Sequence, residues 1–75
     1  MPDADNIKAR IEAAIPGSRA EVEDWTGGGD HFRATVVADA FSGLSRIQQH
    51  RLVYEIFGEE IGGPIHALSL KTHSQ

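Results

Sequence analysis

A helical pattern between two strand patterns restricts the fold of this chain more than any other feature. Residues 31–38 are rich in β-branched side chains, and residues 65–72 alternate between apolar and polar side chains. Between these strands, apolar residues recur at helical spacing until Gly-Gly-Pro at 62–64. A strand, a helix and a second strand form a crossover connection, which makes the two strands parallel. Parallel neighbours begin at the same edge, so we expect the first residues of both strands to lie together.

The N-terminal part of the chain predicts a helix followed by a hairpin. Asp3 or Asp5 is suited to cap the helix, and Pro16-Gly17 ends it. Residues 19–25 predict a strand, which a glycine-rich turn at 26–30 joins to the strand at 31–38. The apolar stripe of this first helix consists of Ile7, Ile11 and Ile15.

A second helix is predicted from the cap Ser45 to residue 61, with a short helical turn over residues 41–46 and a frayed tail from His73. The pattern indicates an α+β fold with the order helix, strand, strand, helix, strand. We expect a single small domain over residues 1–75, with a three-stranded mixed sheet and the helices on one face. The core-facing stripe of the second helix is predicted to be Ile47, His50, Val53, Tyr54, Phe57 and Ile61.

Composition excludes several classes of function. The 75 residues include no cysteine, so thiol nucleophiles, thiolate zinc sites and a self-sufficient iron–sulfur site are absent. The net charge of −4 disfavours a general affinity for nucleic acid or anionic lipid. No apolar run reaches the roughly 20 residues of a membrane span, and the acidic N-terminus lacks a signal peptide's apolar segment. We therefore expect a cytoplasmic protein without a membrane partner.

Enzyme motifs are missing, so we expect a protein that is not an enzyme. The serines lie in no Gly-x-Ser-x-Gly elbow, and no Gly-Lys-Ser or Gly-Lys-Thr follows the glycine run. The candidate site is instead the sheet edge at which His31 and His66 begin their strands, beside the loop over residues 27–29. Alternation places His66 on the face of Leu68 and Leu70, where it is either a half-buried structural histidine or a metal ligand.

Three segments carry a resemblance to a known family. Residues 30–32 read Asp-His-Phe, residues 41–54 read Phe-Ser-Gly-Leu-Ser-Arg-Ile-Gln-Gln-His-Arg-Leu-Val-Tyr, and residues 65–72 read Ile-His-Ala-Leu-Ser-Leu-Lys-Thr. In this order and spacing they resemble the BolA-like family over nearly the whole chain. The short loop before Asp30 is similar to that of compact bacterial members.

The resemblance implies a fold similar to type II KH domains and a partner. BolA-like proteins form heterodimers with monothiol glutaredoxins around a bridging 2Fe–2S cluster, whose thiolate ligands come from the glutaredoxin and its glutathione. The histidine ligand corresponds to His66, and apo iron–sulfur proteins would be recipients. Many members have a further cysteine or histidine ligand where this chain has Gly28, so His31 is the nearest substitute. Other candidate partner-binding residues are Gly27, Gly28, Gly29, Arg46, Arg51 and Lys71.

Two alternatives remain open. The first is a nucleic-acid-binding transcriptional regulator with a KH-like fold, which the net charge and the missing Gly-x-x-Gly clamp disfavour. The second is an adaptor that binds glutaredoxin without a cluster.

Overall fold

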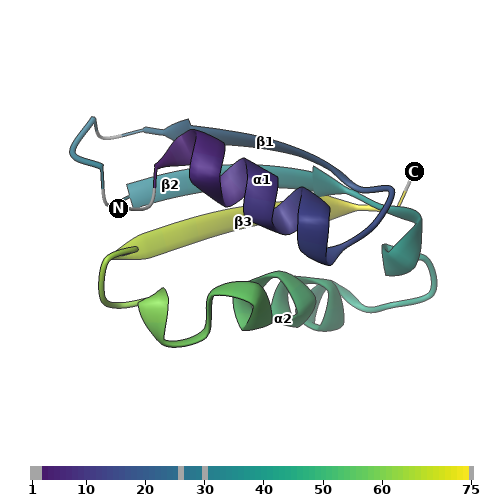
Figure 1. The fold of residues 1–75 in the computed structure, drawn as a ribbon. Helices are drawn as coiled ribbons and strands as arrows, with labels where there is room; N and C mark the ends of the chain where they lie inside the picture. Colours follow the sequence, from purple (N-terminus) through teal and green to yellow (C-terminus); the bar gives the residue numbers. More distant parts are fainter. Residues whose placement is uncertain (1–2, 26, 30, 75) are drawn as a thin grey trace.

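The computed structural model describes residues 3–25, 27–29 and 31–74, and its elements follow the predicted order (Figure 1). Predictions for Thr26, Asp30 and Gln75 lie outside these residues. Two short 3₁₀ turns, η1 and η2, flank the second helix. The elements are α1 (Ala4–Ala14), β1 (Arg19–Asp24), β2 (His31–Val37), η1 (Asp39–Phe41), α2 (Arg46–Phe57), η2 (Gly58–Glu60) and β3 (Ala67–His73).

The three strands form one mixed sheet in the order β1-β2-β3. β1 is antiparallel to β2, whereas β3 is parallel to β2 with Ala67 level with His31. Figure 1 shows α1 crossing in front of the sheet, with α2 running along the β3 side. The predicted α+β architecture and the parallel crossover are both confirmed.

One core lies between the helices and a single face of the sheet. Phe32, Ala34 and Val36 of β2 are buried in alternation with their neighbours, as predicted. Asp3 caps α1 by accepting a hydrogen bond from the Asn6 amide. Among the described residues, no helix is both long and apolar enough to cross a membrane. The remaining core side chains are Ile7, Ile11, Ile15, Ala20, Ala38, Phe41, Val53, Phe57, Ile65 and Leu68.

The predicted apolar stripe of α2 is wrong at its first residue, and the helix is shorter than predicted. Ile47 is 71% exposed, and the helix stops at Phe57 because Gly58 adopts a positive φ of 54°. Ile61 packs against the core, as predicted, but from beyond the end of the helix. Gln49 takes the inward position instead, since its amide donates to the carbonyls of Phe41 and Leu44 at 3.2 and 3.0 Å. A polar side chain thus supplies hydrogen bonds to the backbone carbonyls of the turn before the helix. The periodicity of apolar residues could not predict this inward position of Gln49.

Other boundaries also differ from the predictions. The short helical turn lies at residues 39–41 rather than 41–46. β1 stops at Asp24, one residue early, and β3 begins at Ala67 rather than residue 65. His73 belongs to β3 rather than to a frayed tail, because its carbonyl accepts a hydrogen bond from the Ala38 amide at 3.0 Å.

Glu12 connects the end of α1 to the start of β1. Its Oε2 atom accepts from Lys8 Nζ at 2.7 Å and from the Ala20 amide at 3.0 Å. These hydrogen bonds, led by that from Lys8, hold the pKa of Glu12 below its ordinary value of 4.5. The stabilisation is therefore present above pH 4.5 and is lost as the pH falls through the lowered pKa of the folded state.

We predict that Glu12→Gln is less stable than the wild type at pH 7 and that this difference shrinks below pH about 4.5. Urea unfolding midpoints at pH 7, 4.5 and 3 measure it. Glu21→Gln, which removes an exposed carboxylate from β1, is the matched control. A stability difference that is the same at all three pH values would contradict the prediction.

Candidate functional site

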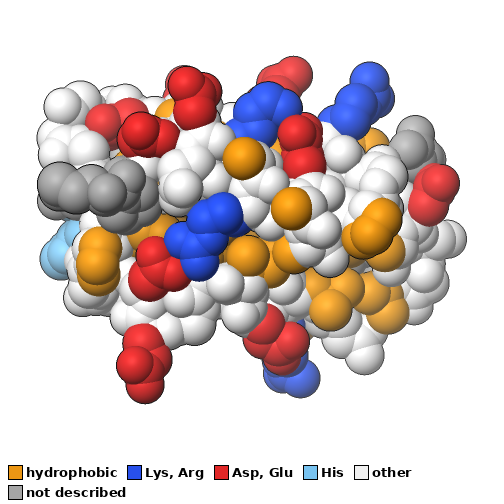
Figure 2. Space-filling view, viewed as in Figure 1, with side chains coloured by type: hydrophobic (Ala, Val, Ile, Leu, Met, Phe, Trp, Pro, Cys, Tyr) orange, Lys and Arg blue, Asp and Glu red, His pale blue; other side chains and the backbone are white. Residues whose placement is uncertain are grey.

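The two histidines lie together at the end of the sheet where β2 and β3 begin. His31 is level with Ala67, so the preceding residue, His66, stands beside it. Their ring centroids are 4.8 Å apart and the ring planes are inclined by 50°. Figure 2 shows a histidine side chain at this end of the molecular surface. The predicted juxtaposition at one edge is confirmed, and the rings are in direct contact.

The predicted facing of His66 is wrong. We expected the ring on the leucine face of the strand, either as a half-buried structural histidine or as a metal ligand, but His66 is exposed and precedes the first residue of β3. The reason is Ile65, which is fully buried and forms an isolated bridge with Ile61. The inward turn of Ile65 interrupts the alternation that Leu68 would otherwise extend back to residue 66.

His31 is half-buried and its ring lies between the rings of Trp25 and His66. The alternation that buries Phe32 places His31 on the opposite face of β2, as predicted. The Trp25 ring meets the His31 ring edge-on at a centroid distance of 6.2 Å. The Arg33 guanidinium lies 4.7 Å from the centre of the Trp25 ring. Trp25 thus limits the orientations open to His31 from the side away from His66.

Trp25 was not among the predicted site residues. It is 48% exposed, which is unusual for a large aromatic side chain that has apolar surface to bury. A signal was available in the sequence, because a tryptophan directly before the glycine turn must lie near the first residues of the returning strand. Only the pairing register shows that its neighbour is His31 rather than Phe32.

The glycine loop is held back toward β1 by Asp24. The carboxylate of Asp24 accepts hydrogen bonds from the amides of Gly27 and Gly29 at 3.1 and 2.8 Å. Both glycines have φ near 77°, a conformation that other residues rarely adopt. The loop therefore joins the histidine end of the sheet without adding side-chain bulk from residues 27–29.

Arg46, Arg51 and Lys71 do not join the histidine pair. Lys71 lies four residues beyond Ala67, about 13 Å along β3. It shares a hollow of about 480 Å³ with Arg46, His50 and other residues of α2 and β3. Arg51 lines an adjacent hollow with Ile47 and Tyr54. The three cations form a basic flank along α2 and β3, separate from the histidine end.

The histidine pair is an incomplete set of metal ligands. Neutral imidazole nitrogens suit iron, zinc and copper. Within the described part of the chain, no three or more His, Cys, Asp or Glu side chains converge on one point. The described residues thus offer two imidazole ligands at this end, and the exposed His66 ring is accessible to a second molecule that carries further ligands.

Comparisons with known proteins agree on one family. The family profile described as BolA-like protein matches residues 10–75. Mouse BolA-like protein 1 is 39% identical over 72 residues, which cover 87% of this chain and 53% of the mouse protein. A Vibrio cholerae protein called DNA-binding transcriptional regulator BolA is 40% identical over 48 residues, which cover 64% of this chain and 45% of that protein.

Solved structures show the same similarity. A bolA protein homologue from Coxiella burnetii has a TM-score of 0.81 and 40% identity, covering 99% of this chain and 92% of that one. The chain spans about half the length of the mammalian relative it matches, but nearly the full length of the bacterial structure.

We predict that His66→Ala changes the free energy of unfolding by less than about 0.5 kcal/mol, because an exposed side chain outside the strand supports little of the core. Chemical denaturation of both proteins, followed by far-ultraviolet circular dichroism, measures the difference. A loss of about 1–3 kcal/mol, the cost of an unsatisfied buried hydrogen bond, would instead assign His66 to the scaffold.

Proposed function

The chain belongs to the BolA-like family, and on this basis we propose that it binds a monothiol glutaredoxin and shares a bridging 2Fe–2S cluster through His66. The observation that carries the proposal is the contact between the His31 and His66 rings, 4.8 Å between centroids, at an accessible end of the sheet. The protein would serve as an iron–sulfur trafficking or regulatory factor, and it would act through binding rather than catalysis.

The ligands available support this division of roles. The sequence has no cysteine, whereas iron–sulfur clusters are held mainly by thiolates. The glutaredoxin and its glutathione would supply those thiolates, and this chain would supply imidazole. Imidazole in place of thiolate raises the reduction potential of a 2Fe–2S centre, as in Rieske proteins.

His31 is the better candidate for a second contribution than any residue of the loop. Gly28 has no side chain to offer at the position where many family members have a ligand. His31 is close enough to His66 for both rings to face one partner, and Trp25 restricts its orientation. The slim loop over residues 27–29 would let the partner approach this end closely.

A second candidate function rests on the basic flank. Arg46 and Lys71 line one hollow with His50, and the name of the Vibrio cholerae relative describes DNA binding. Three cations provide few phosphate contacts, and the net charge of −4 opposes the approach of a polyanion. We therefore rank nucleic-acid binding below the glutaredoxin complex.

The main prediction concerns the visible spectrum of the mixed complex. Mixing this protein with a cluster-loaded monothiol glutaredoxin should produce absorption and circular dichroism features that the glutaredoxin homodimer lacks. His66→Ala should restore the spectrum of the glutaredoxin alone, and His31→Ala should have a smaller effect. The same mixture should quench the fluorescence of Trp25, the sole tryptophan, because the cluster would lie beside it.

His73→Ala is the matched control, because it removes an exposed histidine at the other end of β3. Its mixture should retain the wild-type spectrum. A complex that forms without any new absorption would favour the adaptor without a cluster. An unaltered spectrum in His66→Ala would contradict the ligand role.

For nucleic acid, we predict dissociation constants at physiological salt no tighter than the non-specific range of about 10⁻⁴–10⁻⁶ M. Gel shifts at increasing salt, with Arg46→Ala and Lys71→Ala for comparison, test this. Nanomolar binding of one sequence that survives such salt and is lost in both variants would promote the second candidate to the first.

A further inference from the structure

The segment that delivers His66 is a closed turn. The Glu60 carbonyl accepts hydrogen bonds from the amides of Gly63 and Ile65 at 3.1 and 3.0 Å. The Gly62 amide returns a hydrogen bond to the Ile65 carbonyl at 2.8 Å. Glu60 is thus the backbone acceptor that sets the path of the chain into Ile65, directly before His66.

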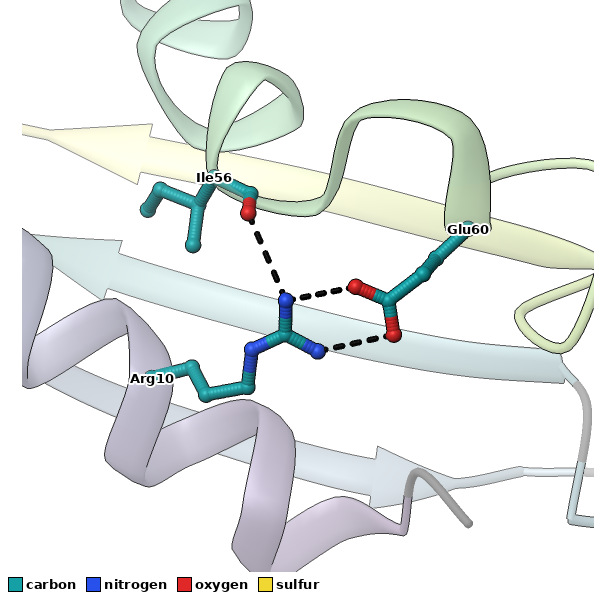
Figure 3. Close-up of polar contacts among 3 residues, drawn as sticks. All are labelled: Arg10, Ile56 and Glu60. Carbon is teal, nitrogen blue, oxygen red and sulfur yellow. Dashed lines mark hydrogen bonds and ion pairs between the residues drawn. The ribbon is translucent and has the colours of Figure 1, made fainter.

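The side chain of the same residue is held from across the molecule. Arg10 of α1 forms a two-pronged ion pair with the Glu60 carboxylate, at 2.8 Å from Nη1 to Oε1 and 2.5 Å from Nη2 to Oε2 (Figure 3). Nη2 also donates to the Ile56 carbonyl at 3.4 Å. Such a paired geometry restricts direction as well as distance, which a single lysine ammonium does not.

Packing limits the movement of the Arg10 side chain. Its guanidinium lies 4.7 Å from the centre of the Phe57 ring, whose side chain is buried in the core. Arg10 and Glu60 are each about one-third exposed, so solvent screens their attraction only in part. Arg10 therefore contacts the last residues of α2 and the turn after it, at three separate points.

We propose that Arg10 is a positioning residue for His66: through Glu60 it fixes the turn that places the His66 ring against His31. The functional part of this inference rests on the ligand role proposed above for His66. The positioning part concerns the free protein and can be tested without a glutaredoxin.

The first experiment uses nuclear magnetic resonance of the free protein. The ring signals of His31 and His66 are assigned with the two alanine variants, and the contact between the rings is followed by their nuclear Overhauser effect. We expect Arg10→Gln and Glu60→Gln to weaken this effect, to shift the His66 ring signals and to speed hydrogen exchange of the Ile65 amide. The His73 ring signals should stay in place.

Three further variants separate positioning from general stability. Lys8→Gln removes the partner of Glu12, an exposed ion pair of the same helix, and should leave the His66 ring unchanged. Arg10→Lys retains the positive charge but cannot form the two-pronged ion pair with Glu60. It should therefore show the same shifts of the His66 ring signals, and it provides the test if Arg10→Gln fails to fold. Exchanging the charges, Arg10→Glu with Glu60→Arg, should restore the His66 signals in part.

The second experiment titrates the same variants with cluster-loaded glutaredoxin. Loss of a group that hydrogen-bonds a metal ligand directly typically costs about 10–100-fold in metal affinity. Arg10 acts on His66 only through Glu60 and the turn, so we expect the lower end of this range, about a 10-fold weaker formation of the mixed spectrum in Arg10→Gln.

The two proposals fail separately. If the wild type forms no mixed spectrum while Arg10→Gln displaces the His66 ring, the cluster role is wrong and the positioning role holds. If the ring signals and the spectrum are the same in wild type, Arg10→Lys and Glu60→Gln, Arg10 has only a structural role.

Discussion

The parallel pairing of β2 with β3 is the constraint on which the rest of the structure depends. It requires α2 to return the chain along the sheet, so both strands start at the same end. This return brings His31 and His66, 35 positions apart in the sequence, into ring contact. An antiparallel pairing of the same two strands would separate these residues by the length of the sheet. The candidate site is therefore a product of topology, since no local motif contains both histidines.

Much of the fold could be predicted because its signals are local. The isoleucine stripe of α1, the alternation of β2 and the cap at Ser45 each specify an element without reference to the others. The predictions fail where the position of a side chain depends on hydrogen bonds to residues outside its own helix or strand. Gln49 lies inward because its amide donates to two carbonyls of the preceding turn, whereas the apolar Ile47 is exposed.

The sequence predicted that His31 and His66 lie together, but it did not predict the exposure and orientation of their side chains. The prediction that the two parallel strands begin at the same edge places His31 beside His66. The exposure of His66 depends on the burial of Ile65, whose amide donates to the Glu60 carbonyl in the preceding turn. The long-range pair between Arg10 and Glu60 has no pattern in the sequence, because the two residues are separated by 50 positions and neither spacing nor periodicity relates them. Trp25 was missed for a similar reason, since its role depends on the hairpin register.

The two edge strands of the sheet, β1 and β3, are both unsuited to pairing with a strand of another molecule. The Tyr54 hydroxyl donates to the Leu68 carbonyl at 2.8 Å, and the Thr72 hydroxyl donates to the Gln49 side chain at 2.6 Å, so α2 contacts β3 at two points along the strand. The other edge strand, β1, carries Arg19, Glu21, Glu23 and Asp24, and charged edges resist pairing with further strands. Because α2 contacts one edge strand and the other carries charged side chains, the addition of further strands at either edge of the sheet is disfavoured. A partner that docks at the histidine end would therefore contact side chains at the starts of β2 and β3 rather than extend the sheet by a further strand.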